Sequence, residues 1–316
     1  LSVSLAIDDK KTMAASLLSL GSIAEIEKNY PVAETYFKQS LSLNREIKND
    51  LDIFYCLFHL SILAGQYYKD FKTSFAYDLQ ALEVSQKIGF QRAIAQAHTS
   101  LGINYGAVGN YALAQEHLEQ SLSIRQRVGL AVGVGHVYLV LGELAFFEGS
   151  DYEKAIAYEK QALQILLEVT ALFIAGIAYG YLALSYAKIE NYAQTLATAF
   201  NHFETFSDIG SDKSNGLVHL AMARALFAVQ KSPVFFRNLE ERIGHISALT
   251  KLDPTPMRYI KMAVQISTIS QIRLEVLIDA GVLLVEMGES GLAHTYLVDA
   301  KEHAKEIDNP HKLNII

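Results

Sequence analysis

Residue patterns that could support catalysis are scarce in this chain. The run Gly133-Val134-Gly135 lacks the third glycine of a dinucleotide-binding loop and opens a predicted helix with no strand before it. The sequence contains no phosphate-binding Gly-Lys-Ser/Thr string, and none of its 10 histidines has a second histidine four residues away, as a helical metal site requires. We therefore predict no catalytic residue, no metal site and no cofactor.

The remaining reactive side chains also have simple structural interpretations. Cys56 lies in an apolar helical run, and the sequence shows no basic neighbour beyond His59, so we expect a packed thiol and not a nucleophile. Glu143 and Asp279 are predicted helix carboxylates without an evident partner, which we expect to be solvated or to line a groove. The protein is therefore not expected to be an enzyme.

The composition restricts the possible partners. The chain has 27 basic and 34 acidic residues, a formal net charge of −7, and Lys10-Lys11 is the nearest approach to a basic run. Because binding to nucleic acid phosphates needs clustered Lys and Arg, we expect no direct nucleic acid ligand. A single cysteine excludes an internal disulfide framework and fits a reducing compartment, which predicts a cytoplasmic protein.

Five short strings recur along the chain at almost constant spacing. Each pairs a residue that can cap a helix N-terminus with an aromatic residue: Asn29-Tyr30, Asp70-Phe71, Asn110-Tyr111, Asp151-Tyr152 and Asn191-Tyr192. The steps between them are 41, 40, 41 and 40 residues. Such a period indicates a solenoid, in which each unit buries its apolar face against its neighbours and the array presents one continuous surface.

Small residues mark the helix that precedes each string. The landmark position, where a small side chain lets the paired helix approach closely, holds Gly21, Ser61, Gly102, Gly142, Ala183 and Ala223. The two 41-residue steps predict one extra residue in the turns before Asp70 and before Asp151. Glycines at 89, 129 and 210 are predicted to end the second helices in the left-handed conformation.

This pattern resembles the tetratricopeptide repeat, most fully in Leu101-Gly102, Tyr105, Asn110-Tyr111, Ala114 and Ser121-Leu122. The chain has no tryptophan, and its unit is longer than the usual length of about 34 residues. In this it is similar to the long variant found in signalling regulators and in the sensor arms of signal-transducing ATPases. The resemblance implies an all-α solenoid, a superhelix of antiparallel helix pairs with about seven repeats. Other helical repeats with units of about 40 residues are the competing fold.

We predict a single solenoid domain over residues 1–316. Its repeats are expected at about 12–48, 51–88, 91–128, 131–168, 171–209, 213–248 and 255–307. Surplus residues before the last repeat predict one helix of about 30 residues from Thr255 to Met287. Residues 4–7 are typical of the end of a preceding second helix, so we expect a segment of a longer protein.

One uncharged stretch, from Val169 to Ala187, is long enough to cross a bilayer. It falls in register with the first helices of the other repeats and contains three tyrosines and two glycines. We therefore expect a buried solenoid helix there and no membrane association.

The resemblance also implies which side chains line a concave groove. In tetratricopeptide arrays the first helices form this face, and the positions around the landmark carried over to this chain are Tyr55, Phe58, Ile62, Thr99, Ile103, Leu139, Glu143, Phe146, Leu184, Leu220, Arg224 and Phe227. The set is too apolar for a clamp that holds acidic peptide termini. Two alternatives stay open: these side chains are buried between adjacent repeats, or they accept an apolar helix or extended peptide.

From these features we expect a protein- or peptide-binding scaffold, acting as the ligand-sensing or partner-binding arm of a larger cytoplasmic signalling protein. The alternative is a stand-alone receptor for a peptide pheromone that regulates transcription or a phosphorelay. An enzyme is the third and least favoured class.

Overall fold

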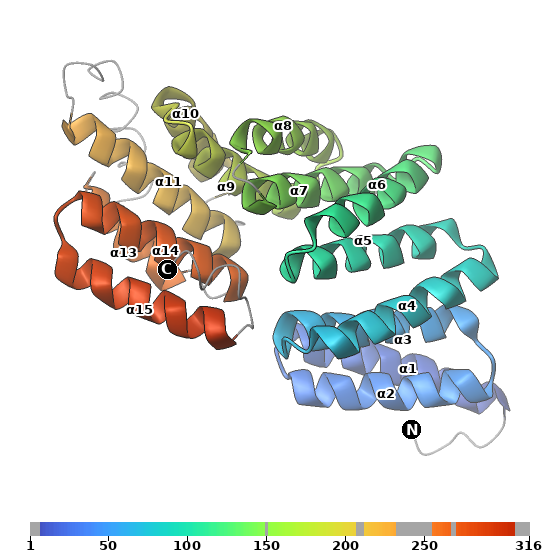
Figure 1. Ribbon diagram of the computed structural model, residues 1–316. Helices are drawn as coiled ribbons and strands as arrows, with labels where there is room; N and C mark the ends of the chain where they lie inside the picture. Colours follow the sequence, from blue (N-terminus) through green and yellow to red (C-terminus); the bar gives the residue numbers. More distant parts are fainter. Residues whose placement is uncertain (1–6, 149–150, 207–211, 232–254, 267–269, 307–316) are drawn as a thin grey trace. The chain divides into compact units, whose positions relative to one another are not determined.

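The chain is described by a computed structural model that defines residues 7–148, 151–206, 212–231, 255–266 and 270–306. These residues form helices joined by short turns, and none of them lies in a strand (Figure 1). The all-α prediction is confirmed. The helices form two compact units, Leu1–Leu130 and Ala131–Ile316, which are described separately.

In the N-terminal unit each predicted repeat is a pair of neighbouring helices. The elements are α1 (Ile7–Ile26), α2 (Tyr30–Glu46), α3 (Asp50–Ile62), the π-helical turn η1 (Leu63–Tyr67), α4 (Phe71–Ile88), α5 (Gln91–Ala107) and α6 (Tyr111–Arg127). Helix α1 packs along α2, α3 along α4, and α5 along α6. The first helices of successive repeats also touch, α1 with α3 and α3 with α5, and we call these the first-helix layer of the unit.

The C-terminal unit repeats this arrangement and then departs from it. Its helices are α7 (Ala131–Glu148), α8 (Tyr152–Glu168), α9 (Leu172–Lys188), α10 (Tyr192–Phe206), α11 (Asp212–Lys231), α13 (Pro256–Ile266), α14 (Ser270–Glu286) and α15 (Ser290–Glu306). Here the first-helix layer consists of α7, α9, α11 and α14, each of which contacts the next. The second helix expected within repeat 213–248 lies outside the described residues, and α13 packs along α11.

The predicted caps begin most of the second helices. The side chains of Asp70, Asn110, Asp151 and Asn191 each accept a hydrogen bond from the backbone N–H three residues later, at 3.0 to 3.4 Å. Asn29 makes no such bond. Gly89 and Gly129 adopt positive φ as predicted, and Gly210 lies outside the described residues. Local sequence signals therefore determine most of the helix ends.

The landmark glycines are required by close helix packing. A Cβ atom added to Gly21 would lie 2.5 Å from the Phe37 ring, and one added to Gly102 would lie 2.7 Å from Cγ of Leu118. The predicted role of the small residues is thus confirmed in both places, because a larger residue would force the paired helix away.

The extra residue before Asp70 is accommodated differently from the prediction. It lies inside the helix and not in the turn, because α3 continues into η1, where the N–H of Tyr68 bonds to the carbonyl of Leu63. A π-helical turn absorbs one residue without breaking the helix, so the cap at Asp70 keeps its place. The corresponding turn before Asp151 includes residues 149–150, which lie outside the described residues.

The prediction of one helix from Thr255 to Met287 is wrong. The structure has two helices, α13 and α14. Val264 of α13 packs against a cluster that includes Leu277 and Ile278 of α14, and Arg273 of α14 donates to the carbonyl of Val264. In a continuous helix Val264 and Leu277 would be about 20 Å apart, since each residue adds about 1.5 Å. The chain therefore folds back, and this reversal allows α13 and α14 both to pack against α11.

Two helices are apolar enough to raise the question of a membrane. By length and composition alone α7 could cross one, yet 56% of that stretch is buried within the structure. Helix α9, which covers most of the uncharged stretch, is shorter and has buried residues along its length, including Tyr181 and Leu184. Both helices serve as core elements of the C-terminal unit.

Candidate functional site

In the N-terminal unit four of the predicted groove residues form a half-buried apolar stripe. Tyr55, Phe58 and Ile62 lie three and four residues apart on α3, and Ile103 lies on the adjacent α5. The buried Phe54 supports the stripe, with ring centroids 5.3 Å from Tyr55 and 6.2 Å from Phe58. We call these four residues the apolar stripe.

Thr99 does not belong to this surface. It is fully buried, and its hydroxyl lies 2.8 Å from that of Ser121 and donates to the carbonyl of Ala95. Arg125 also donates a hydrogen bond to the Thr99 hydroxyl, at 3.4 Å. Because Ser121 and Arg125 belong to α6, Thr99 joins the two helices of its own repeat, and the prediction that it lines a groove needs this correction.

In the C-terminal unit four of the predicted groove residues are core residues. Leu139 and Phe146 are 3% and 4% exposed, while Leu184 and Leu220 are fully buried. The Phe146 ring lies 5.1 Å from that of Tyr152 and 5.9 Å from that of Tyr181, between helices. These four side chains are unavailable to a ligand in this structure. The prediction that they line a groove is therefore wrong, and the alternative, burial between adjacent repeats, describes them.

The other three predicted residues of this unit stay half-buried: Glu143, Arg224 and Phe227. The Lys231 ammonium lies 4.3 Å from the centre of the Phe227 ring, a cation–π contact. Arg224 takes part in an ion cluster that sequence reasoning missed.

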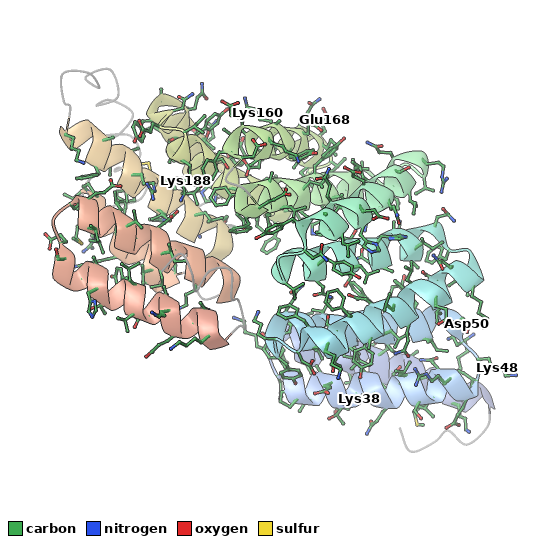
Figure 2. The ribbon with its side chains drawn as sticks, viewed as in Figure 1. Lys38, Lys48, Asp50, Lys160, Glu168 and Lys188 are labelled. Atoms are coloured by element: carbon green, nitrogen blue, oxygen red, sulfur yellow. The ribbon has the colours of Figure 1, made fainter. Side chains whose placement is uncertain are left out.

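This cluster joins three members of the first-helix layer. Lys188 at the end of α9 places its Nζ 2.6 Å from Oδ1 of Asp279 on α14, and Nη2 of Arg224 on α11 lies 3.5 Å from the same oxygen (Figure 2, where Lys188 is labelled). The expectation that Asp279 is solvated or lines a groove is wrong, because its side chain is only 7% exposed. No sequence signal pairs residues 91 positions apart, so only the fold reveals this contact.

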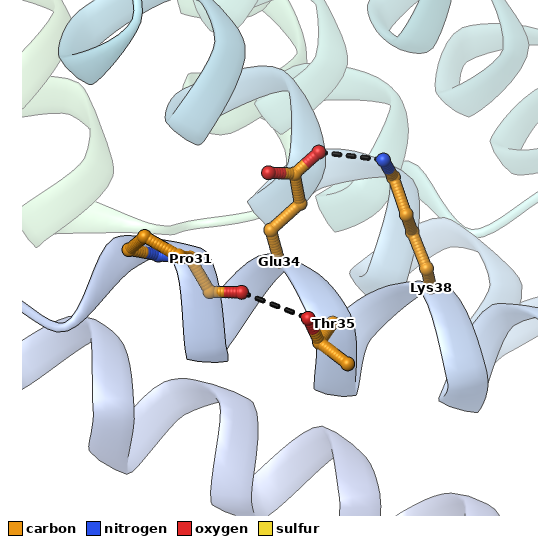
Figure 3. Close-up of polar contacts among 4 residues, drawn as sticks. All are labelled: Pro31, Glu34, Thr35 and Lys38. Carbon is orange, nitrogen blue, oxygen red and sulfur yellow. Dashed lines mark hydrogen bonds and ion pairs between the residues drawn. The ribbon is translucent and has the colours of Figure 1, made fainter.

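The surface of the second helix α2 has a different character. On α2 the Lys38 ammonium lies 2.6 Å from the Glu34 carboxylate one turn earlier, and Thr35 donates to the carbonyl of Pro31 (Figure 3). Both bonds lie at exposed positions within a single helix. An exposed pair of this kind adds little stability and indicates a solvated face.

Part of the chain matches a known family of repeats. Residues 68–127 and 93–168 match the family described as tetratricopeptide repeat. Residues 68–168 therefore carry tetratricopeptide repeats. No curated protein matches the chain significantly.

Solved structures extend the likeness of fold beyond the matched residues. A Rap protein complexed with Competence and Sporulation Factor is similar over 96% of this chain and 78% of its own, with a TM-score of 0.68 and 16% identity. Aspartyl phosphate phosphatase F from Bacillus subtilis is similar over 93% of this chain and 70% of its own, with a TM-score of 0.66 and 16% identity. At these identities the likeness concerns the fold.

A third similar structure is a Signal Transduction ATPase with Numerous Domains (STAND) protein with a tetratricopeptide repeat sensor, from Pyrococcus horikoshii. The similarity covers 95% of this chain with a TM-score of 0.57 and 19% identity. The chain spans 43% of that protein's length. The long-repeat resemblance seen in the sequence thus agrees with the folds of these solved structures.

Two of the second helices, α4 and α8, each carry a buried carboxyl group. Asp78 on α4 accepts hydrogen bonds from Ser100 at 2.8 Å and from Asn104 at 2.6 Å, both on α5 of the next repeat. Glu159 on α8 accepts from Ser185 on α9 in the same way. Burial raises the pKa of Asp78 to about 6 and that of Glu159 well above its usual range. Burial therefore favours the neutral form of Glu159 and makes Asp78 easier to protonate than an exposed aspartate, and both groups connect consecutive repeats.

Several histidines are packed inside the repeats. The Nδ1 atoms of His98 and His117 lie 2.9 Å apart, so one ring donates and the other accepts. Burial lowers the pKa of His98 to about 4, and burial likewise lowers the pKa values of His202 and His219 to about 4. These rings are neutral at pH 7, and within the part of the chain that the structure describes no three His, Cys, Asp or Glu residues could hold a metal ion.

Cys56 is placed as the sequence predicts. Its thiol is buried and lies 3.3 Å from the hydroxyl of Ser40, and burial raises the pKa of Cys56 to about 11. A thiol with such a pKa is almost entirely protonated at neutral pH, which makes it a poor nucleophile.

Proposed function

We propose that this chain is a protein- or peptide-binding scaffold that acts as the ligand-sensing or partner-binding arm of a larger cytoplasmic signalling or regulatory protein. Tetratricopeptide repeats support the general role, since a solenoid offers a long continuous surface for binding. The observation that carries the proposal is the apolar stripe on α3 and α5.

The stripe has the chemistry of a docking surface for an apolar segment. Tyr55 and Phe58 offer large rings whose positions are fixed by packing on Phe54, so little side-chain freedom is lost on binding. Ile62 and Ile103 extend the surface to the next repeat. An amphipathic helix or an extended peptide with apolar side chains is the partner that such a surface fits.

The test compares two surfaces of the same unit. The whole chain is immobilised, proteins and peptides are captured from a cytoplasmic extract, and the amounts are measured by mass spectrometry for the unmodified chain and for Phe58→Ala. Leu79→Ala is the matched control, because Leu79 is 55% exposed on the second helix α4. Loss of a central aromatic anchor costs about 2 kcal/mol, a decrease of roughly 30-fold in affinity.

The outcomes separate the possibilities. Selective loss of a captured partner in Phe58→Ala supports the stripe. Equal capture by both variants and the unmodified chain contradicts it, and loss in Leu79→Ala alone assigns binding to the second-helix surface. Helical circular dichroism of each variant establishes that the change concerns binding and not folding.

The second candidate is a stand-alone peptide receptor that regulates transcription or a phosphorelay. The structural likeness to a Rap protein complexed with Competence and Sporulation Factor favours it, because that likeness has the higher TM-score of the two regulator folds. A peptide receptor purified from its natural cells would release a short peptide on denaturation, which mass spectrometry detects. Capture of a folded protein without any short peptide would favour the first candidate.

A further inference from the structure

Two buried histidines lie where three helices of the C-terminal unit meet. His202 on α10 is fully buried, and His219 on α11 is 7% exposed. The centroid of the His219 ring lies 5.2 Å from that of Phe203 on α10 and 5.6 Å from that of Tyr259 on α13. The centroid of the His202 ring lies 5.5 Å from that of the same Phe203. These four side chains form one cluster, which we call the histidine junction.

His202 has no hydrogen bond to compensate its burial. Neither nitrogen of its ring has a partner among the residues that the structure describes. A neutral imidazole has one donor and one acceptor nitrogen, and burial of both without partners opposes folding. His219 differs, because its Nδ1 donates to the carbonyl of Asn215 at 2.6 Å. In the closed junction His202 is therefore held by packing alone.

The histidine junction contains no carboxylate to stabilise a positive charge. Burial lowers the pKa of His202 to about 4, and repulsion from His219 adds to the shift. Burial also lowers the pKa of His219 to about 4, although its bond to the Asn215 carbonyl acts in the opposite direction. Neither shift is opposed by a carboxylate of the described residues. Proton uptake by either ring is therefore disfavoured as long as the junction stays closed.

The ionisable groups of the surrounding helices are exposed, bonded elsewhere or uncharged. Those exposed on α10, α11, α13 and α14 are Glu204, Lys231, Arg258, Lys261 and Glu286. On α14, Asp279 pairs with Lys188 of α9 and Arg224 of α11, and Arg273 donates to a carbonyl of α13. Burial raises the pKa of Tyr179 on α9, so this phenol is uncharged at neutral pH. None of these groups acts on the pKa of either histidine.

We propose that the histidine junction is a proton-operated release, in which protonation of His202 or His219 opens the packing of α10 and α13 on α11. A charged imidazole regains its hydration only if the helices part, because the rings around it supply no counter-charge. Helix α14 packs against both α11 and α13, so this opening also loosens the terminal pair α14 and α15. The release lies in a different unit from the apolar stripe and does not depend on the proposed binding function.

The release follows from acidification. In the closed junction each ring has a pKa of about 4, against the ordinary value of 6.5 that it regains on opening. The closed form is therefore fully favoured above pH 6.5 and becomes less favoured as the pH falls from 6.5 toward 4. Between pH 7 and about pH 5.5, one such ring shifts the equilibrium toward opening by roughly eightfold and two rings by roughly 60-fold.

Amide hydrogen exchange of the whole chain at pH 7 and at about pH 5.5 tests the release, after correction for the intrinsic pH dependence of exchange. Helices α1 and α2 contain no histidine and provide the internal reference. On acidification we expect the protection of α13 to decrease by more than about tenfold relative to this reference. An equal change in α13 and in the reference overturns the proposal.

Two substitutions distinguish the histidine junction from a general effect of acid. His202→Phe keeps an aromatic ring of similar size and removes one titrating group, and His294→Phe is the matched control at an exposed position of α15. The readout is the ratio of α13 protection between the two pH values, because a packing defect alone changes protection equally at both. We expect this ratio to decrease roughly eightfold in His202→Phe and to stay unchanged in the control.

A second variant covers the case in which His202→Phe does not fold. His219→Gln removes the other titrating group, and its side-chain amide can still donate to the carbonyl of Asn215. It should lower the ratio by the same factor of roughly eight. A ratio equal to that of the unmodified chain in either folded variant overturns the proposal.

Discussion

Replacement of Asp78 by Asn should stabilise the protein at neutral pH. Burial raises the pKa of this carboxyl group from 3.8 to about 6, against the opposing effect of hydrogen bonds from Ser100 and Asn104. The native state therefore holds the proton more tightly than the unfolded state. The favourable contribution of Asp78 to the free energy of unfolding is complete below pH 3.8. It declines between pH 3.8 and about 6 and is lost above that range.

The magnitude follows from the pKa difference. A shift from 3.8 to about 6 corresponds to about 3 kcal/mol at pH 7, since each pKa unit is worth about 1.4 kcal/mol. Asn cannot ionise and avoids this cost. Its carbonyl can accept from Asn104, and its amide can donate to the hydroxyl of Ser100, so both neighbours keep a partner. We expect a gain of about 1 to 3 kcal/mol at pH 7 and little difference near pH 4.

Urea denaturation at pH 7 and at pH 4.5, together with amide hydrogen exchange in α3, α4 and α5, measures the effect. The exposed cap Asp70 provides a control of opposite sign, because its hydrogen bond with Thr73 lowers the pKa and its contribution is lost as the pH falls. In the Asp70→Asn variant, Asp78 should therefore still stabilise the protein more as the pH falls. An Asp78→Asn protein that is less stable than the unmodified chain by the same amount at both pH values would refute the reasoning.

Three further substitutions, one of them with an exposed control, test the packing. Gly102→Leu should cost about 1 to 3 kcal/mol by overpacking, because even its Cβ would lie 2.7 Å from Leu118, and an unchanged thermal melting curve would contradict this. Phe146→Ala should cost about 3 to 5 kcal/mol, whereas Phe173→Ala, at a position 58% exposed, should change the melting temperature little. Glu159→Gln should melt at or above the temperature of the unmodified chain, because burial already favours a neutral group there; a clear decrease would show that the charged form is needed.

The local signals of the sequence predicted the repeat architecture well. Caps such as Asp70 and close contacts such as Gly102 depend on residues near in sequence, and their side-chain chemistry specifies them directly. The half-buried positions of Tyr55 and Phe58 also agree with the expected surface. That these residues bind a partner stays a prediction.

The predictions from sequence were wrong where tertiary packing determines side-chain exposure and helix ends. The position one residue after the landmark is half-buried in α3 at Ile62 and fully buried in α9 at Leu184, because exposure depends on which neighbouring helices cover it. A long apolar run without a breaker predicted one helix after Thr255, but packing against α11 folds α13 and α14 back on each other.

The sequence by itself determined the fold class, the repeat length and the capped starts of most second helices, because these follow from short-range periodicity, capping and the size of single side chains. Only the tertiary structure decided which groups lose their water. It brings Lys188 within 2.6 Å of Asp279 across 91 residues and encloses Asp78 between consecutive repeats. Charge interactions and pKa values depend on spatial distance and on the exclusion of water, and neither can be obtained from the order of residues alone.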